Sequence, residues 1–166
     1  RSYTAYWDLL GAADMTARAA DLAAERERMR ALEAATIAHA DPGDREGEKK
    51  LNQQGVETSV IRTDGRSGRR AIQWFSYDLP VSGSAPLALV ATYNGDQRRP
   101  RSFDVLVNGT RVGSETQPQS SLSRFYEKEY TIPAALLGDR PTLTVRFEAT
   151  NGLEVTPVFG VRLIRR

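Results

Sequence analysis

The chain has 166 residues, of which 40% are hydrophobic and 27% charged, a balance that predicts a folded domain with a buried core. Lys and Arg exceed Asp and Glu by 23 to 21, a surplus too small to predict nucleic-acid binding. The absence of cysteine excludes a disulfide, a thiolate nucleophile and a cysteine-ligated metal. Because no apolar run approaches the ~20 residues that cross a bilayer, we expect no membrane partner.

The first fifty residues predict a short strand, a long helix and a polar linker. Residues 3–10 alternate aromatic and polar side chains as a strand does, and residues 12–35 are rich in the helix formers Ala, Arg, Glu and Leu. The apolar stripe of this helix, Met15, Leu22 and Met29, is narrow, so we expect the helix to lie on a surface. Pro42 and Gly43 end the section, and the polar residues 45–50 are interpreted as a linker.

Residues 51–166 predict a mainly β domain, an antiparallel β-sandwich of the jelly-roll type. Short runs of alternating apolar and polar residues follow one another, each closed by turn residues. Asn108 and Gly109 form the favoured two-residue hairpin turn, in which both positions need a positive φ. Residues 133–137 predict a single helical turn. The predicted strands cover residues 56–62, 71–78, 87–93, 102–107, 111–115, 125–132, 143–149 and 159–163.

No group of residues suited to catalysis stands out. The single histidine, His39, is followed by Asp41, but no second histidine or cysteine is present to complete a triad or a zinc site. Glu127 and Glu129 lie on one strand face, where surface charge explains them better than an acid–base pair. We therefore expect that this chain is not an enzyme.

Four residues are candidates for binding a sugar: Trp74, Tyr93, Asn94 and Arg99. An aromatic ring at a strand end, beside amide and carboxylate groups, can stack on a sugar ring while the polar groups bind its hydroxyls. The alternative is that Asn94 begins a turn and Tyr93 completes the core. Trp74 has the same two interpretations, because it faces away from its neighbour Phe75 on a predicted strand.

Several short motifs, in their order along the chain, resemble the C-terminal region of glycoside hydrolases of families 127 and 146, the β-L-arabinofuranosidase type. In that family catalysis belongs to an upstream α/α barrel with glutamate and cysteine residues at a zinc site. Relatives often place a histidine before the Asn-Gln segment, where this chain has Leu51. The motifs are residues 1–7, the helix, the turn at 41–44, and residues 52–59, 74–79 and 161–164.

This resemblance implies that the chain is a fragment of a longer, secreted or periplasmic protein. The chain begins without an initiator Met or a signal peptide, which agrees with that expectation. Residues 1–50 would then pack toward the missing catalytic domain, which is the expected partner. The parent enzyme would act on arabinose-containing plant polysaccharide.

Residues 51–166 alone resemble the galactose-binding-like jelly roll of many carbohydrate-binding modules. The resemblance rests on a Glu-bearing first strand, residues 74–80, a strand that ends at 93–95, and residues 103–109. Such modules often hold a structural calcium ion through carboxylate and carbonyl oxygens, and Glu57 is the candidate ligand that the resemblance implies. The expected function is a non-catalytic accessory domain that supports its enzyme or binds carbohydrate. A stand-alone sugar-binding module and a protein-interaction domain remain as alternatives.

Overall fold

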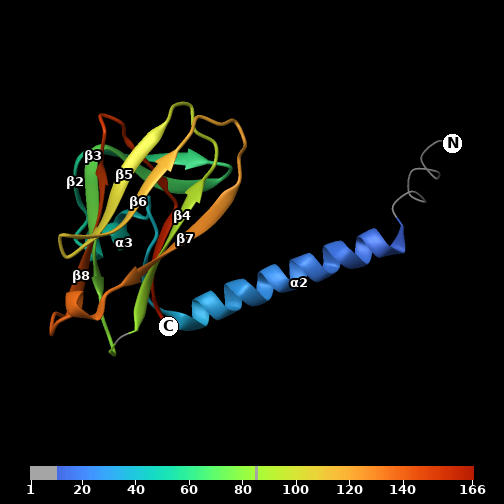
Figure 1. The fold of residues 1–166 in the computed structure, drawn as a ribbon, viewed down its shortest axis with the longest axis horizontal. Coiled ribbons are helices and arrows are strands. Elements are labelled where there is room, and N and C mark those ends of the chain that lie inside the picture. The colour runs from blue at the N-terminus through green and yellow to red at the C-terminus, as the bar shows by residue number, and fades with distance from the viewer. Residues whose placement is uncertain (1–10, 85) are drawn as a thin grey trace. The chain divides into compact units, whose positions relative to one another are not determined.

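The computed structural model describes residues 11–84 and 86–166 as two compact units, which divide between Ala35 and Thr36. The described part of the first unit is one long helix, α2 (Ala12–Ala35), and the second unit is a two-sheet β-sandwich (Figure 1). The strands are β1 (Thr36–Ala40), β2 (Gln54–Thr63), β3 (Arg66–Pro80), β4 (Leu87–Asn94), β5 (Arg101–Val107), β6 (Thr110–Gln117), β7 (Phe125–Ile132), β8 (Thr142–Ala149), β9 (Val155–Val158) and β10 (Gly160–Arg165).

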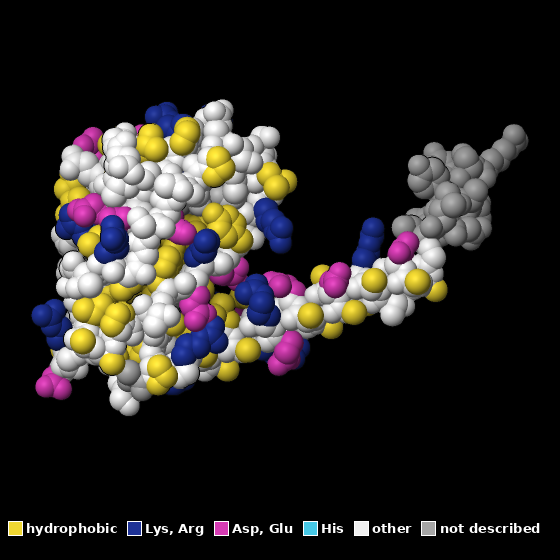
Figure 2. Space-filling view, in the orientation of Figure 1, with side chains coloured by type: hydrophobic (Ala, Val, Ile, Leu, Met, Phe, Trp, Pro, Cys, Tyr) yellow, Lys and Arg dark blue, Asp and Glu magenta, His cyan; other side chains and the backbone are white. Residues whose placement is uncertain are grey.

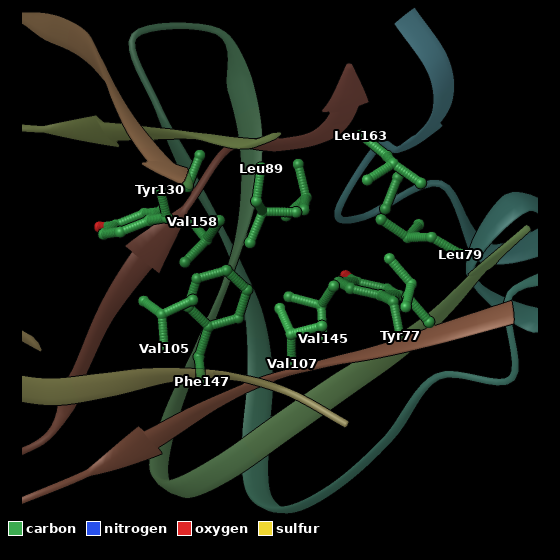
Figure 3. Packing of buried hydrophobic residues seen from close by; sticks show 14 of the residues in the cluster. Tyr77, Leu79, Leu89, Val105, Val107, Tyr130, Val145, Phe147, Val158 and Leu163 are labelled. Carbon is green, nitrogen blue, oxygen red and sulfur yellow. The ribbon is translucent and has the colours of Figure 1, made fainter. Parts of the chain in front are cut away.

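One sheet has the strand order β1-β10-β4-β7, and the other has the order β2-β3-β8-β5-β6 with β9 added to β3. All of the named strand pairs are antiparallel. The apolar positions of the alternating strands face each other between the sheets, where aromatic and branched side chains fill the interior (Figure 3). Phe75 stacks on Phe147 with ring centroids 5.1 Å apart, and both are fully buried. The expected fold class, a mainly β sandwich with one long helix, is confirmed.

The eight predicted strands all coincide with observed strands. The hairpin at Asn108 and Gly109 is also present, with φ of 50° and 84° at these two residues. The helical turn predicted after residue 133 is a short 3-10 helix, η1 (Ala134–Leu136). The strand predicted for residues 3–10 lies outside the described residues.

The linker predicted between the helix and the sandwich is wrong, and the sandwich unit begins at Thr36 instead of residue 51. Residues before the turn at Pro42 form β1, which pairs with β10 at the edge of one sheet. Residues after it form a short helix, α3 (Arg45–Lys50). Glu48 of this helix is buried and binds Arg69 and Tyr77 of β3, so α3 is anchored to the sandwich.

Helix α2 has no buried residue in the described structure. Figure 2 shows its apolar side chains spread along its length between acidic and basic ones. Met15 is 65% exposed and Leu22 58% exposed, and the expectation that this narrow apolar stripe lies on a surface stays a prediction. Among the described residues, no helix combines the length and the apolar character that crossing a membrane requires.

Candidate functional site

Strand β3 changes partner along its length, and this change creates a groove on the outside of the sandwich. Ala71 pairs with Val155 of β9, whereas Trp74 pairs with Glu148 of β8. Between these two pairings, β3 has an extra residue relative to its other neighbour, β2, which forms a β-bulge. The connection from β8 to β9 therefore bends away over the bulge and walls a cavity of about 550 Å³.

Trp74 is the large aromatic side chain of this groove, which we call the Trp74 groove. Ile72 and Leu153 add apolar surface, and both are exposed. Polar groups surround them, including two carboxylates, and Trp74 itself is half-buried. The groove is lined by Ile72, Gln73, Trp74, Arg146, Glu148, Ala149, Thr150, Asn151, Gly152, Leu153 and Glu154.

Arg146 fixes the orientation of the tryptophan. Its guanidinium lies 3.9 Å from the centroid of the Trp74 ring, a cation–π contact. Arg146 Nη2 donates to Glu148 Oε1 at 2.5 Å, which holds the guanidinium in place. Arg146 covers one face of the Trp74 ring, so the remaining surface of the indole faces the groove.

Glu154 connects the groove to the loop between β4 and β5. Its carboxylate accepts hydrogen bonds from Arg101 at 2.6 Å and from Arg99 at 3.4 Å. Arg101 also donates to Gln97, whose amide donates to Thr156. Burial of the Arg101 side chain lowers its pKa, and the charge of Glu154 opposes that change. Arg99, a residue predicted for the site, thus reaches the groove through its ion pair with Glu154.

Glu57 belongs to β2 and lies opposite the β-bulge of β3; its φ is 52°. Its Oε1 accepts a hydrogen bond of 2.6 Å from Gln73 Nε2, which lines the groove. In the described part of the chain, no three His, Asp or Glu side chains lie close enough together to hold a metal ion. Calcium also accepts backbone carbonyl oxygens and water as ligands, so the role of Glu57 as a calcium ligand stays a prediction.

The structure places Tyr93 in the core, so its predicted role in sugar binding is wrong. The side chain has no exposed surface, and its hydroxyl lies 2.8 Å from that of Tyr130. Both faces of the central strand β4 are largely covered, and Tyr93 lies on the face that packs into the core between the sheets. Burial raises the pKa of Tyr93, so the hydroxyl stays protonated.

Asn94 is 1% exposed, and its amide shapes the loop after β4. Asn94 Oδ1 accepts the backbone N–H of Asp96 at 2.8 Å, and Nδ2 donates to Ser123 at 3.3 Å. These bonds match the alternative interpretation, in which Asn94 begins a turn. Asn94 lines a second cavity, separate from the Trp74 groove.

The sequence did not reveal that Arg146 and two glutamates, Glu148 and Glu154, line the groove with Trp74. Arg146 and Glu148 belong to β8, and only the pairing of β8 with β3 puts them beside the tryptophan. Glu154 and Arg101 are far apart in the chain and have no sequence pattern that links them. Of the predicted residues, Trp74 lines the groove, and Glu57 and Arg99 contact its lining side chains.

A family model described as a family of unknown function, DUF6805, matches residues 31–164. The chain belongs to this family. The match to DUF6805 begins near the end of α2 and includes nearly all of the sandwich unit. No curated protein sequence matches this DUF6805 chain.

The DUF6805 sandwich is similar to several solved structures. A family 35 carbohydrate-binding module from Clostridium thermocellum has a TM-score of 0.52 at 11% identity, over 69% of this chain and 93% of that one. An exo-β-1,3-galactanase from Phanerochaete chrysosporium, solved with β-1,3-galactotriose, has a TM-score of 0.51 at 10% identity, over 78% and 29%. The Agl-KA catalytic domain has a TM-score of 0.51 at 13% identity, over 80% and 28%. At such low sequence identity, the structural similarity establishes a shared fold alone.

Proposed function

We propose that this DUF6805 domain is a non-catalytic, carbohydrate-binding accessory domain, and that it binds its sugar in the Trp74 groove. The observation that carries the proposal is a half-buried tryptophan set among carboxylate and amide side chains on the outside of the sandwich. The fold that it shares with a family 35 carbohydrate-binding module supports the same proposal.

The groove matches the surface chemistry of a sugar. One face of a sugar ring presents C–H groups, which pack on an indole or on aliphatic side chains such as Ile72 and Leu153. The hydroxyl groups at the ring edge need acceptors and donors, which Glu148 and Asn151 provide. A cavity of about 550 Å³ lies within the ordinary range for small-ligand sites.

The parent protein in this proposal is a secreted glycoside hydrolase of the family 127 or 146 type that acts on arabinose-containing plant polysaccharide. The order of the sequence motifs supports this assignment. Helix α2 supports a partner within the parent chain, because its apolar side chains at Met15 and Leu22 are exposed in the described unit. The catalytic domain of the same chain is the proposed partner of this helix.

Titration calorimetry of the whole chain against arabinan and galactan oligosaccharides tests the proposal. We expect saturable binding, weakened about tenfold by Trp74→Ala through loss of the stacking surface. The matched control is Leu122→Ala, which removes an apolar side chain that is 68% exposed and lies outside the groove. Repeating the titration with added calcium and with a chelator tests the calcium expectation.

Two results would contradict the proposal. Absence of heat with every oligosaccharide, with and without calcium, would favour a purely structural role for the domain. Equal affinities of the Trp74→Ala and Leu122→Ala variants would move the binding site away from the groove.

A further inference from the structure

A second cavity, of about 440 Å³, lies between the turn that joins β2 to β3 and the loop that joins β4 to β5. We call it the arginine pocket. Ile61, Pro157 and Phe159 supply its apolar surface. Two buried amide side chains, Asn94 and Gln97, form part of its wall, and both are held by hydrogen bonds within the protein. The pocket is thus a built cavity with an apolar part and a polar part.

The charged lining of this pocket is unbalanced. Four arginines line it against two aspartates, which leaves two positive charges in excess; they are Arg62, Arg70, Arg98 and Arg101 against Asp64 and Asp96. Only Arg101 among these arginines forms an ion pair with a described carboxylate, that of Glu154. Arg62 donates to a backbone carbonyl and a serine hydroxyl, and Arg70 donates to a serine hydroxyl, all of them neutral groups.

The arginines also act on one another. Arg70 and Arg99 lie close enough to Arg101 for their charges to add to the effect of burial in lowering its pKa. Glu154 is shared between Arg99 and Arg101. With Arg99 and Glu154 counted, five arginines stand against three carboxylates, so two positive charges in excess are available to an anion from solution.

We propose that the arginine pocket binds the carboxylate of an acidic sugar, a uronic acid residue of the glycan held in the Trp74 groove. This inference rests on the proposed function. A guanidinium binds a carboxylate through two parallel hydrogen bonds. The apolar surface at Phe159 and Pro157 takes the C–H face of the sugar ring. Asp64 and Asp96 accept hydroxyl groups and disfavour a doubly charged phosphate, which a pocket with arginines alone would prefer.

The two cavities share a boundary. Arg101 lines the arginine pocket, Glu154 lines the Trp74 groove, and the two side chains are joined by an ion pair of 2.6 Å. One glycan chain can therefore lie across this ion pair, with a neutral residue at Trp74 and an acidic residue at the arginines. The position of the ion pair predicts a preference for glycans that contain both kinds of residue.

The test compares oligogalacturonate with its fully methyl-esterified form, which has the same sugar rings without the charge. We expect the acid to bind at least about tenfold more tightly than the ester. We also expect its affinity to fall as sodium chloride is raised, because salt screens partly exposed charges. Inorganic phosphate and sulfate, titrated alone, should bind more weakly than the acidic oligosaccharide.

The variants Arg98→Gln and Arg70→Gln should each weaken the acid about tenfold and leave the ester unchanged. Arg98 is exposed, so its replacement should leave the fold intact even where the Arg70 variant does not. Arg140→Gln is the matched control, since Arg140 precedes β8 near Thr142, which pairs with the end of β3 remote from the pocket.

Equal binding of acid and ester would overturn this inference while leaving the Trp74 groove and its neutral ligands intact. Binding of phosphate or sulfate as tight as that of the acid would also overturn it, by showing a general anion site. Loss of affinity for the ester in the arginine variants would show damage to the domain instead of loss of a carboxylate contact.

Discussion

Replacing Glu48 by Gln is expected to destabilise the sandwich strongly, because it removes the charge from a buried cluster. Glu48 is 5% exposed. Its carboxylate accepts hydrogen bonds from Arg69 at 2.7 and 3.1 Å and from the Tyr77 hydroxyl at 2.5 Å. These contacts hold helix α3 against β3, so the perturbation acts on the attachment of one element to the sheet.

The size of the destabilisation follows from Arg69, whose charge stays buried without its partner. Removing one partner of a buried ion pair costs about 3–5 kcal/mol, since the other charge stays buried without compensation. We expect the lower end, about 3 kcal/mol, because the Arg69 side chain keeps 11% exposure and a hydrogen bond to Thr58. At roughly 2–4 °C per kcal/mol, the melting temperature should fall by about 6–12 °C.

Urea unfolding and thermal melts of three proteins measure this effect: the native chain, Glu48→Gln and Glu46→Gln. Glu46 is an exposed residue in the first turn of α3, so its variant removes the same charge from the same helix. We expect the control to change the free energy of unfolding by less than about 0.5 kcal/mol. Equal unfolding midpoints for the two variants would refute the argument that the buried pair anchors α3.

Two further predictions use the buried polar groups. Burial raises the pKa of Glu48, but hydrogen bonds from Arg69 and Tyr77 outweigh it, so this pKa lies below its ordinary value of 4.5. The unfolded chain then binds the proton more tightly than the folded one, so the stabilisation by Glu48 is present above about pH 4.5 and is lost as pH falls through the folded-state pKa. In urea unfolding, the free energies of unfolding of the native chain and of Glu48→Gln should therefore approach each other as the pH is lowered. A difference between them that does not change with pH would contradict this. Tyr93→Phe should lower the free energy of unfolding by about 1 kcal/mol, because the hydrogen bond to Tyr130 is lost. The affinity for any oligosaccharide should not change. A weaker affinity in titration calorimetry would show that Tyr93 takes part in sugar binding.

The strands with regular alternation could be predicted from sequence, because one face of each packs into the core. The turn at Asn108 could also be predicted, since the positive φ that it needs is a local property. Strands β1 and β9 could not. Each is short, and each is stabilised by a partner distant in the chain, β10 for β1 and β3 for β9. Their existence depends on tertiary pairing instead of local preference.

The candidate site was less accessible to sequence reasoning. Trp74 and Tyr93 had the same two interpretations, core or binding residue. Both residues lie on strands that have a neighbour on each side, but Tyr93 lies on the face that packs into the core, whereas Trp74 lines the groove on the outer face. Arg101 and Glu154 meet only because the connection between β8 and β9 folds back beside β5.

The change of partner along β3 separates the shape of the groove from the stability of the domain. Residues 150–154 bridge two strands that are each fixed independently by β3. None of residues 150–154 belongs to the hydrophobic core. Insertions, deletions and substitutions between Thr150 and Glu154 can therefore accumulate at little cost to folding while they change the cavity beside Trp74, provided that Glu154 is kept to pair with the buried Arg101. Related proteins that share the scaffold are expected to diverge most in this segment, and grafting it between them is a direct route to altered ligand preference.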